Sequence, residues 1–153
     1  MKKKLILLFT LLSFAVLVAA VLNTVVWAEA ETSGFCGAEG DGENLWWKFD
    51  PETGTLTIEG EGEMADYNVT QAPWKDYEDR ITTVNISNGV TSIGMYAFRY
   101  YKNLTSIMIG ENITSIGDSA FLGCSALIEV YFNAIEVADL DFMDRVFSDA
   151  GIA

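Results

Sequence analysis

The feature that most constrains the fold of this chain is an internal repeat in its second half. Residues 81–103 and 104–126 align without a gap and are identical at eight positions. These positions are Thr82/Thr105, Ile86/Ile109, Thr91/Thr114, Ser92/Ser115, Ile93/Ile116, Gly94/Gly117, Ala97/Ala120 and Phe98/Phe121. A third copy begins at Leu127, but its aromatic residue, Phe147, comes three positions later than the spacing of Phe98 and Phe121 predicts. One copy is too small to bury an apolar face alone, so the copies must stack.

A period of this length lies within the range of leucine-rich repeats, in which each repeat contributes one strand and a turn or short helix. We therefore predict a mainly β fold, a short leucine-rich-repeat solenoid of 23-residue repeats with an N-terminal β cap, preceded by a signal peptide. The repeats would occupy residues 81–153, as 81–103, 104–126 and a degenerate 127–153.

Apolar and polar residues alternate in "TTVNIS", "TSIMIG" and "LIEVYFN", as they do in half-buried strands. We expect Ile93 and Ile116 to form a second inward column, and Phe98, Phe121 and Phe147 to form an aromatic ladder. The inward strand residues would be Val84, Ile86, Ile107, Ile109, Val130 and Phe132. The outward residues form the candidate binding face: Thr83, Asn85, Ser106, Met108, Glu129 and Tyr131. Three strands about 4.8 Å apart span only ~10 Å, so this face alone would bind weakly.

Residues 29–80 differ from the repeats, and we predict that they cap the N-terminal end of the stack. The alternating runs "LWWKF" and "TLTIEG", joined by "DPETG", predict a hairpin. Ala72 and Trp74 would take the places that an Ala-Phe pair fills in each later coil. The aromatic residues here are expected to build the core of the cap. Trp46 and Trp47 are neighbours on one strand and must face opposite sides, so one of them is exposed.

The first residues have the composition of a secretory signal peptide. Three lysines precede an apolar run from Leu5 to Leu22, and the small residues near Ala28 and Ala30 suit cleavage after either. We predict a signal peptide at 1–28 and a secreted or cell-surface protein. The alternative is an uncleaved anchor, because an apolar run of this length reaches the lower limit of a membrane span.

The strongly acidic composition excludes one class of partner. The formal net charge is −13, and removal of Lys2, Lys3 and Lys4 with a signal peptide lowers it to −16. Binding to nucleic acid rests on Lys and Arg that neutralise phosphates, so we predict no nucleic-acid partner. Contact with a membrane is expected only through the N-terminal segment, if it is not cleaved.

The chain contains no His, which removes Ser-His-Asp and Cys-His nucleophile systems and every His-bearing metal site. We predict no enzyme activity, no catalytic residues, no cofactor and no metal. The acidic clusters at 41–44 and 59–63 lack the spacing of a calcium loop and are predicted to be solvated turns. Whether Cys36 pairs with Cys124 stays open, and Cys124 is expected to act as a small buried apolar residue.

The segment "LTSIMIGENITSIGDSAFLGCSA", residues 104–126, resembles the BspA-like leucine-rich repeats, also called the Treponema pallidum-type repeats, of bacterial surface proteins. Residues 81–103 are similar, with Tyr100 and Tyr101 where Gly123 and Cys124 stand in the next copy. The "GTLTIEGEGEM" and "APW" elements upstream resemble the leader that often precedes such repeats. The resemblance implies an exported solenoid used in adhesion or protein binding, with no shared catalytic residues.

We therefore predict an exported, non-enzymatic adhesion or protein-binding module whose partner is an extracellular protein or glycan. One alternative is a secreted carbohydrate-binding accessory that uses the tryptophans and acidic groups. Another is the opening fragment of a longer surface protein. The strand at 127–132 has an apolar edge, so we expect either that the chain continues past Ala153 or that it self-associates through these residues.

Overall fold

A computed structural model describes residues 32–68, 72–133 and 146–148 of the chain. Contacts divide the chain into two units, Met1–Glu31 and Thr32–Ala153, and all described residues belong to the second. The predicted signal peptide and the segments 134–145 and 149–153 of the third repeat therefore lie outside the described residues. Within the described residues, no helix is long and apolar enough to cross a membrane.

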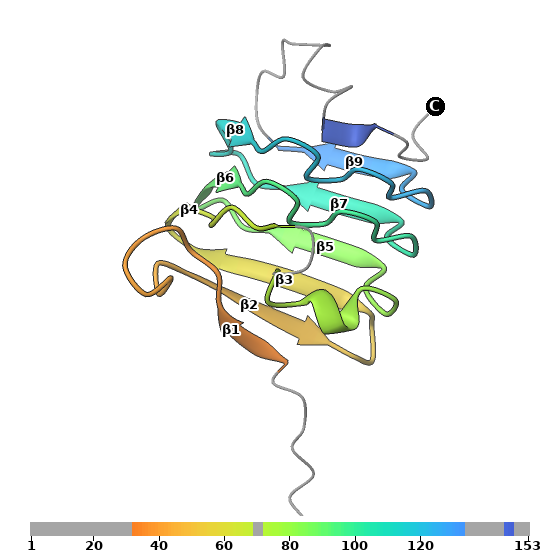
Figure 1. Ribbon diagram of the computed structural model, residues 1–153, viewed down its shortest axis with the longest axis horizontal. Helices are drawn as coiled ribbons and strands as arrows, with labels where there is room; N and C mark the ends of the chain where they lie inside the picture. Colours follow the sequence, from red (N-terminus) through yellow and green to blue (C-terminus); the bar gives the residue numbers. More distant parts are fainter. Residues whose placement is uncertain (1–31, 69–71, 134–145, 149–153) are drawn as a thin grey trace, which may run out of the picture. The chain divides into compact units, whose positions relative to one another are not determined.

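The regular secondary structure of the described residues consists of strands with almost no helix, which confirms the mainly β prediction (Figure 1). The larger sheet has the order β1-β2-β3-β5-β7-β9, and the smaller one has the order β4-β6-β8. The strands of the larger sheet are Ser33–Phe35, Leu45–Asp50, Thr55–Gly60, Thr83–Ile86, Ser106–Ile109 and Glu129–Phe132. Those of the smaller sheet are Gly62–Glu63, Val90–Ile93 and Ser115–Ile116, and one short 3₁₀ helix, η1, covers Lys75–Tyr77.

The predicted hairpin is present as the antiparallel pair β2 and β3. Asp50 shapes its turn, because one carboxylate oxygen accepts from the amide of Glu52 (2.9 Å) and the other from Oγ1 of Thr53 (3.0 Å). These hydrogen bonds, the amide of Glu52 first, lower the pKa of the exposed Asp50 carboxyl. Short local hydrogen bonds of this kind are what favours Asp in tight turns.

The strand direction changes at β3. β3 runs antiparallel to β2 but parallel to β5, and β5, β7 and β9 continue in parallel. A parallel pair needs a long crossover, and here the rest of each coil supplies it, including the short strands β4, β6 and β8. The cap and the repeats therefore share one sheet.

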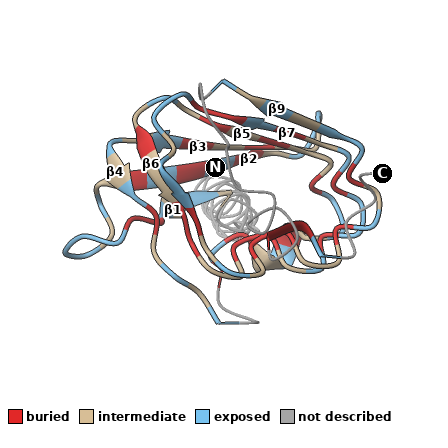
Figure 2. Cartoon of the chain, turned by 90° about the horizontal axis from the view of Figure 1, so that it is seen from above, coloured by how far each residue is buried: buried red, intermediate tan, exposed pale blue. Residues whose placement is uncertain are grey.

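The core lies between the larger sheet and the turns that face it, where buried residues line both inner sides (Figure 2). The predicted inward residues of β5 and β7 are all buried, and Ile93 and Ile116 form the expected second column. Val130 and Phe132 of β9 also pack against this core but are only partly buried. The alternation of apolar residues therefore placed the strand faces correctly.

The predicted aromatic ladder runs through the middle of the coils. Phe98 and Phe121 stack with their ring centroids 5.2 Å apart, and Phe121 and Phe147 with theirs 5.1 Å apart. Trp74 continues the stack into the cap, 5.4 Å from Phe98, as predicted from its sequence position. The amide of Phe121 donates to the carbonyl of Val146 (3.0 Å), which places Phe147 in the third coil despite its displacement in the sequence.

Two tyrosine hydroxyl groups, one at the edge of this core and one inside it, differ in whether they have a hydrogen-bond partner. The hydroxyl of Tyr67 donates to the carbonyl of Cys36 at 3.0 Å. The hydroxyl of Tyr101, whose side chain is 1% exposed, has no hydrogen-bond partner among the described residues. Burial, followed by the negative charge of Glu78, raises the pKa of Tyr101 well above its ordinary value.

We expect Tyr101→Phe to raise the free energy of unfolding by about 1–3 kcal/mol, because it removes a desolvated group that has no partner. Tyr67→Phe, the same change where a partner exists, should lower it by about 1 kcal/mol. The folded protein keeps the Tyr101 proton above pH 10.0, the ordinary pKa at which the unfolded chain loses it. Wild-type stability therefore falls as pH rises through that value, and the advantage of Tyr101→Phe should widen. Urea unfolding near neutral pH and above pH 10 measures both effects; a destabilised Tyr101→Phe protein would contradict the assignment.

Candidate functional site

The outward side chains of the larger sheet form one surface, called here the outer face. Its register places Thr83 beside Ser106 and Ser106 beside Glu129. The parallel register also places Asn85 beside Met108, which in turn lies beside Tyr131. The six residues predicted for a binding face therefore lie together in two rows. Their position is as predicted, whereas their role in binding stays a prediction.

The outer face is wider than the sequence analysis predicted. Both rows continue into the cap, because Thr55 lies beside Thr83 and Thr57 lies beside Asn85, while Lys48 of β2 lies beside Thr57. Six strands about 4.8 Å apart span about 24 Å, instead of the ~10 Å expected for three. The estimate was too small because the cap hairpin joins the same sheet as the repeats.

Four large apolar side chains are exposed on the outer face, in two pairs. Phe35 (56% exposed) lies beside Trp46 (41%) on β1 and β2, at one end of the sheet. Met108 (46%) lies beside Tyr131 (53%) on β7 and β9, at the other end. Trp47 is 3% exposed, so the prediction that only one of the two tryptophans is buried is confirmed. Exposed aromatic and methionine side chains of this kind are typical anchors of protein interfaces.

The groups between the two pairs are small and polar or charged. The hydroxyl groups of Thr83 and Ser106 lie 3.3 Å apart and share a hydrogen bond. Glu59 lies beside Trp46, and Glu129 closes the row at β9. Neither Thr83 nor Ser106 is hydrogen-bonded to a carboxylate among the described residues, so no hydroxyl of this pair has a base to activate it. The arrangement offers contact area and hydrogen bonds.

Phe35 is a member of the outer face that sequence reasoning missed. Its strand, β1, has only three residues, too few for an alternating pattern to be recognised. The only signal in the sequence was the position of Phe35 next to Cys36, which the structure shows to be buried. Trp46, by contrast, belongs to a six-residue strand whose burial alternates at every position but the last, so its exposure could be inferred.

The two acidic clusters both lie within the described residues. Among the residues that the structure describes, no group of three or more potential ligands is close enough to hold a metal ion. Asn44, within the first cluster, has a structural role, since its side-chain nitrogen donates to the carbonyls of Glu61 (3.2 Å) and Glu63 (3.1 Å). Its side-chain oxygen accepts from the amide of Glu39 at 3.2 Å. Asn44 thereby ties the first cluster to the second.

Both cysteines are buried and free, so the pairing that the sequence left open is not made. Burial raises the pKa of each thiol to about 12. The thiol of Cys124 donates to the carbonyl of Phe98 at 3.0 Å, which suits a small core residue and confirms the interpretation of this position. A buried, protonated thiol of this kind is a poor nucleophile.

Comparison with known proteins agrees with the coil geometry. The family pattern described as "BspA type Leucine rich repeat region (6 copies)" matches residues 76–148. A leucine-rich repeat protein from Eubacterium ventriosum, solved by crystallography, is similar in structure with a TM-score of 0.57 and 30% sequence identity. The similarity covers 74% of this chain and 27% of that one, so this chain spans about a quarter of that protein. The search of curated proteins gave no match.

Three observations agree on the same repeating coil. They are the parallel register between β5 and β7, the stacking of Phe98 on Phe121, and the match to the family pattern. The resemblance found in the sequence is thus confirmed, and the fold is of the leucine-rich-repeat type. Residues 76–148 belong to the BspA-type leucine-rich repeat family.

Proposed function

We propose that this chain is an exported, non-enzymatic module that binds an extracellular protein through the outer face of a short solenoid. The observation that supports this best is the exposure of Phe35, Trp46, Met108 and Tyr131 on one face of one sheet. Aromatic residues and methionine are enriched in protein interfaces and carry much of the binding energy. A repeat stack suits this role because neighbouring side chains are aligned in rows.

Charge indicates what kind of partner fits. The chain has a formal net charge of −13, and Glu59 and Glu129 lie on the outer face itself. A partner with basic residues around an apolar centre would be attracted over a distance and then held by the two exposed apolar pairs. The strands of this face have three to six residues, so the face measures about 24 Å by ~10–20 Å, less than the ~800 Å² per partner of a standard interface. We therefore expect a transient complex with fast dissociation.

Export is part of the proposal. Proteins of the BspA type are typically found on the surface of bacteria or secreted by them, and residues 1–28 have the lysines, apolar run and small residues of a signal peptide. The mature chain would then begin near Glu29 or Glu31. N-terminal sequencing of secreted material that still begins at Met1 would remove this part of the proposal.

The binding proposal is tested with a panel of purified basic extracellular proteins and the immobilised chain, by biolayer interferometry. We expect Trp46→Ala and Tyr131→Ala each to raise the dissociation constant by about 10-fold or more, since each removes an exposed anchor. Added salt should slow association, because the charges that steer the encounter are screened.

Tyr100→Gly is the matched control, because Tyr100 is a similarly exposed aromatic residue (48%) that does not belong to the larger sheet. It should leave protein binding unchanged. A bound protein that is insensitive to both Trp46→Ala and Tyr131→Ala, or that is lost with Tyr100→Gly, would show that the outer face is not the binding surface.

A further inference from the structure

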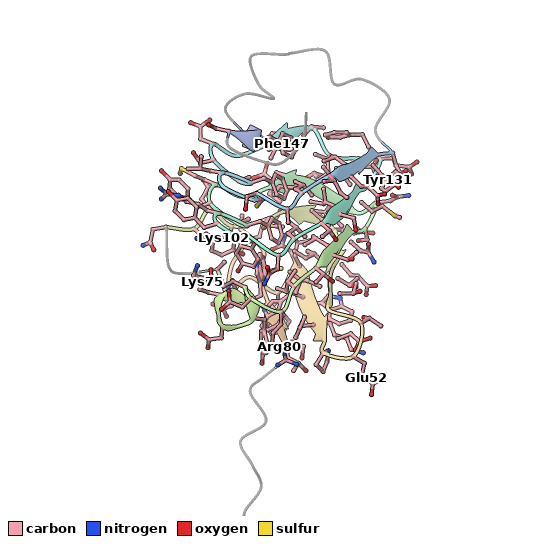
Figure 3. All side chains as sticks on the ribbon, turned by 90° about the vertical axis from the view of Figure 1, so that its right-hand side faces the viewer. Glu52, Lys75, Arg80, Lys102, Tyr131 and Phe147 are labelled. Atoms are coloured by element: carbon pink, nitrogen blue, oxygen red, sulfur yellow. The ribbon has the colours of Figure 1, made fainter. Side chains whose placement is uncertain are left out.

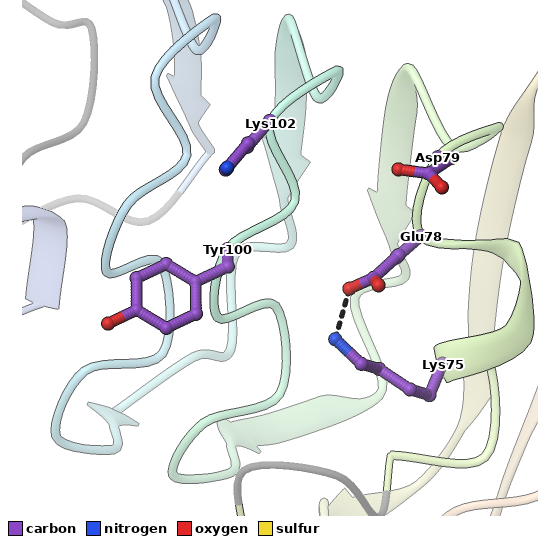
Figure 4. A pocket seen from close by; sticks show the side chains of 5 residues that line it. All are labelled: Lys75, Glu78, Asp79, Tyr100 and Lys102. Carbon is purple, nitrogen blue, oxygen red and sulfur yellow. Dashed lines mark hydrogen bonds and ion pairs between the residues drawn. The ribbon is translucent and has the colours of Figure 1, made fainter.

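A pocket of about 370 Å³ lies on the side of the unit away from the outer face. Lys75, Glu78 and Asp79 line it from the cap, and Tyr100 and Lys102 line it from the first repeat (Figure 4). Figure 3 shows Lys75 and Lys102 on one side of the unit and Tyr131 on the opposite side. The pocket is therefore separate from the surface proposed for protein binding.

The pocket exists because the cap and the first repeat do not have the same shape here. Between the two full repeats the turns are joined by backbone hydrogen bonds, such as that from the amide of Tyr100 to the carbonyl of Leu122 (2.7 Å). The segment that contains η1 is held to the next coil by side chains instead. Asn103 Nδ2 donates to the carbonyl of Asp79 (2.8 Å), and Trp74 Nε1 donates to the carbonyl of Ala97 (3.0 Å). A space is left between the two turns.

Tyr100 stands in this space in a backbone conformation that tyrosine seldom adopts. Its φ is 65°, in the left-handed region, and Gly123 takes the equivalent place in the next repeat with φ 73°. A Cβ on Gly123 would lie 2.7 Å from Cε1 of Tyr100, so the ring rests directly on this glycine. The guanidinium of Arg99 lies 4.6 Å from the ring centroid. Strain of this kind at an exposed aromatic residue is a common property of binding sites.

Basic residues are concentrated around the ring of Tyr100, which is unusual in so acidic a chain. Nine Lys and Arg occur in the sequence, and six of them follow residue 28. Three of those six, Lys75, Arg99 and Lys102, line the pocket or lie against Tyr100. Lys75 is paired with Glu78. Within the described residues, neither the ammonium of Lys102 nor the carboxylate of its neighbour in the pocket, Asp79, has a hydrogen bond or an ion pair.

A free donor, a free acceptor and an aromatic ring are the groups that a sugar uses. Sugar hydroxyls donate to carboxylates and accept from ammonium groups, and the C–H face of the ring packs on an aromatic side chain. The two lysines and two carboxylates of the pocket cancel in charge, and the net charge of −13 disfavours an anionic ligand. The volume lies within the range of small-molecule sites, ~300–1,000 Å³.

We propose that this pocket binds a neutral saccharide, with the ring of Tyr100 as its platform, Lys102 as a hydrogen-bond donor and Asp79 as an acceptor. This site would act beside the outer face and does not depend on it.

The test is titration of the full exported chain with N-acetyllactosamine, mannotriose and cellotriose, followed by isothermal calorimetry and by backbone amide shifts in NMR. We expect at least one of these sugars to bind and to shift the amides of residues 75–79 and 100–103. Tyr100→Gly and Lys102→Gln should each weaken that binding by about 10-fold or more, whereas Tyr131→Ala should not change it. Tyr100→Gly is chosen because glycine suits the left-handed backbone, so the variant should keep its fold, which its amide spectrum would show.

Three results would overturn the proposal. They are no binding by any of the three sugars, binding that persists in both Tyr100→Gly and Lys102→Gln, and binding of sialyllactose in preference to all neutral probes. Loss of sugar binding with Tyr131→Ala alone would place the sugar on the outer face and so also overturn it. Because protein binding is tested with Trp46 and Tyr131 variants, either proposal can fail without the other.

Discussion

Phe121→Ala is expected to lower the free energy of unfolding by about 3–5 kcal/mol, the usual cost of removing a buried aromatic ring. Phe121 is fully buried and stacks on Phe98 on one side and on Phe147 on the other. Its removal would open a cavity at the centre of the second repeat and interrupt the aromatic stack. Urea unfolding followed by tryptophan fluorescence measures the loss, which in a unit this small is a large part of the total stability.

Met108→Ala is the control, because Met108 lies in the same repeat but on the outer face, 46% exposed. We expect it to change stability by less than about 1 kcal/mol. Equal losses for the two variants would mean that the inward and outward faces of the repeat have been exchanged.

Gly94→Ala is expected to destabilise the protein by about 3 kcal/mol or more, because an added methyl group would have no room. A Cβ on Gly94 would lie 2.8 Å from the carbonyl carbon of Ala65 and closer still to its oxygen. The obstacle is backbone of the adjacent coil, which cannot rotate away as a side chain would. Thermal and urea unfolding of the variant would show the loss, and crowding at this contact should also disturb the amide shifts of residues 64–66.

Gly40→Ala separates this steric effect from backbone preference. Gly40 has a φ of 55°, yet a Cβ there would meet nothing within 4 Å. Only the left-handed penalty applies, so we expect a loss of about 1–2 kcal/mol. If Gly94→Ala costs no more than Gly40→Ala, the coils are not in the close contact described.

The repeats could be predicted in detail from the sequence because one pattern occurs twice in register. The alternation in "TSIMIG" determines which side of the strand is buried, and the recurrence of Phe98 as Phe121 places both in the same position of successive coils. Even the displaced Phe147 could be assigned, since the third copy begins at Leu127, one full period after Leu104.

The extent of the outer face could not be predicted, because the cap breaks the period. Thr55 pairs with Thr83 across a longer stretch of sequence than the one that separates Thr83 from its partner Ser106. No second copy therefore indicates in the sequence that β3 precedes β5 in the sheet. The pocket was missed for a related reason. The alignment shows that Tyr100 stands where Gly123 stands in the next copy. It does not show that the backbone keeps its left-handed conformation with a tyrosine in place.

The change of strand direction at β3 determines where the chain can gain further repeats during evolution. The antiparallel strands β1, β2 and β3 form one end of the sheet, so a further coil cannot be inserted among them without breaking an antiparallel pair. On the other side every junction is parallel and repeats in register, and a tandem duplication of the codons for residues 104–126 would add one strand, one stacked phenylalanine and one outward pair. Such an event would lengthen the outer face by about 4.8 Å and leave the cap and the pocket at Tyr100 untouched. Selection could therefore change the length of the outer face in steps of one coil, without any change in the N-terminal cap.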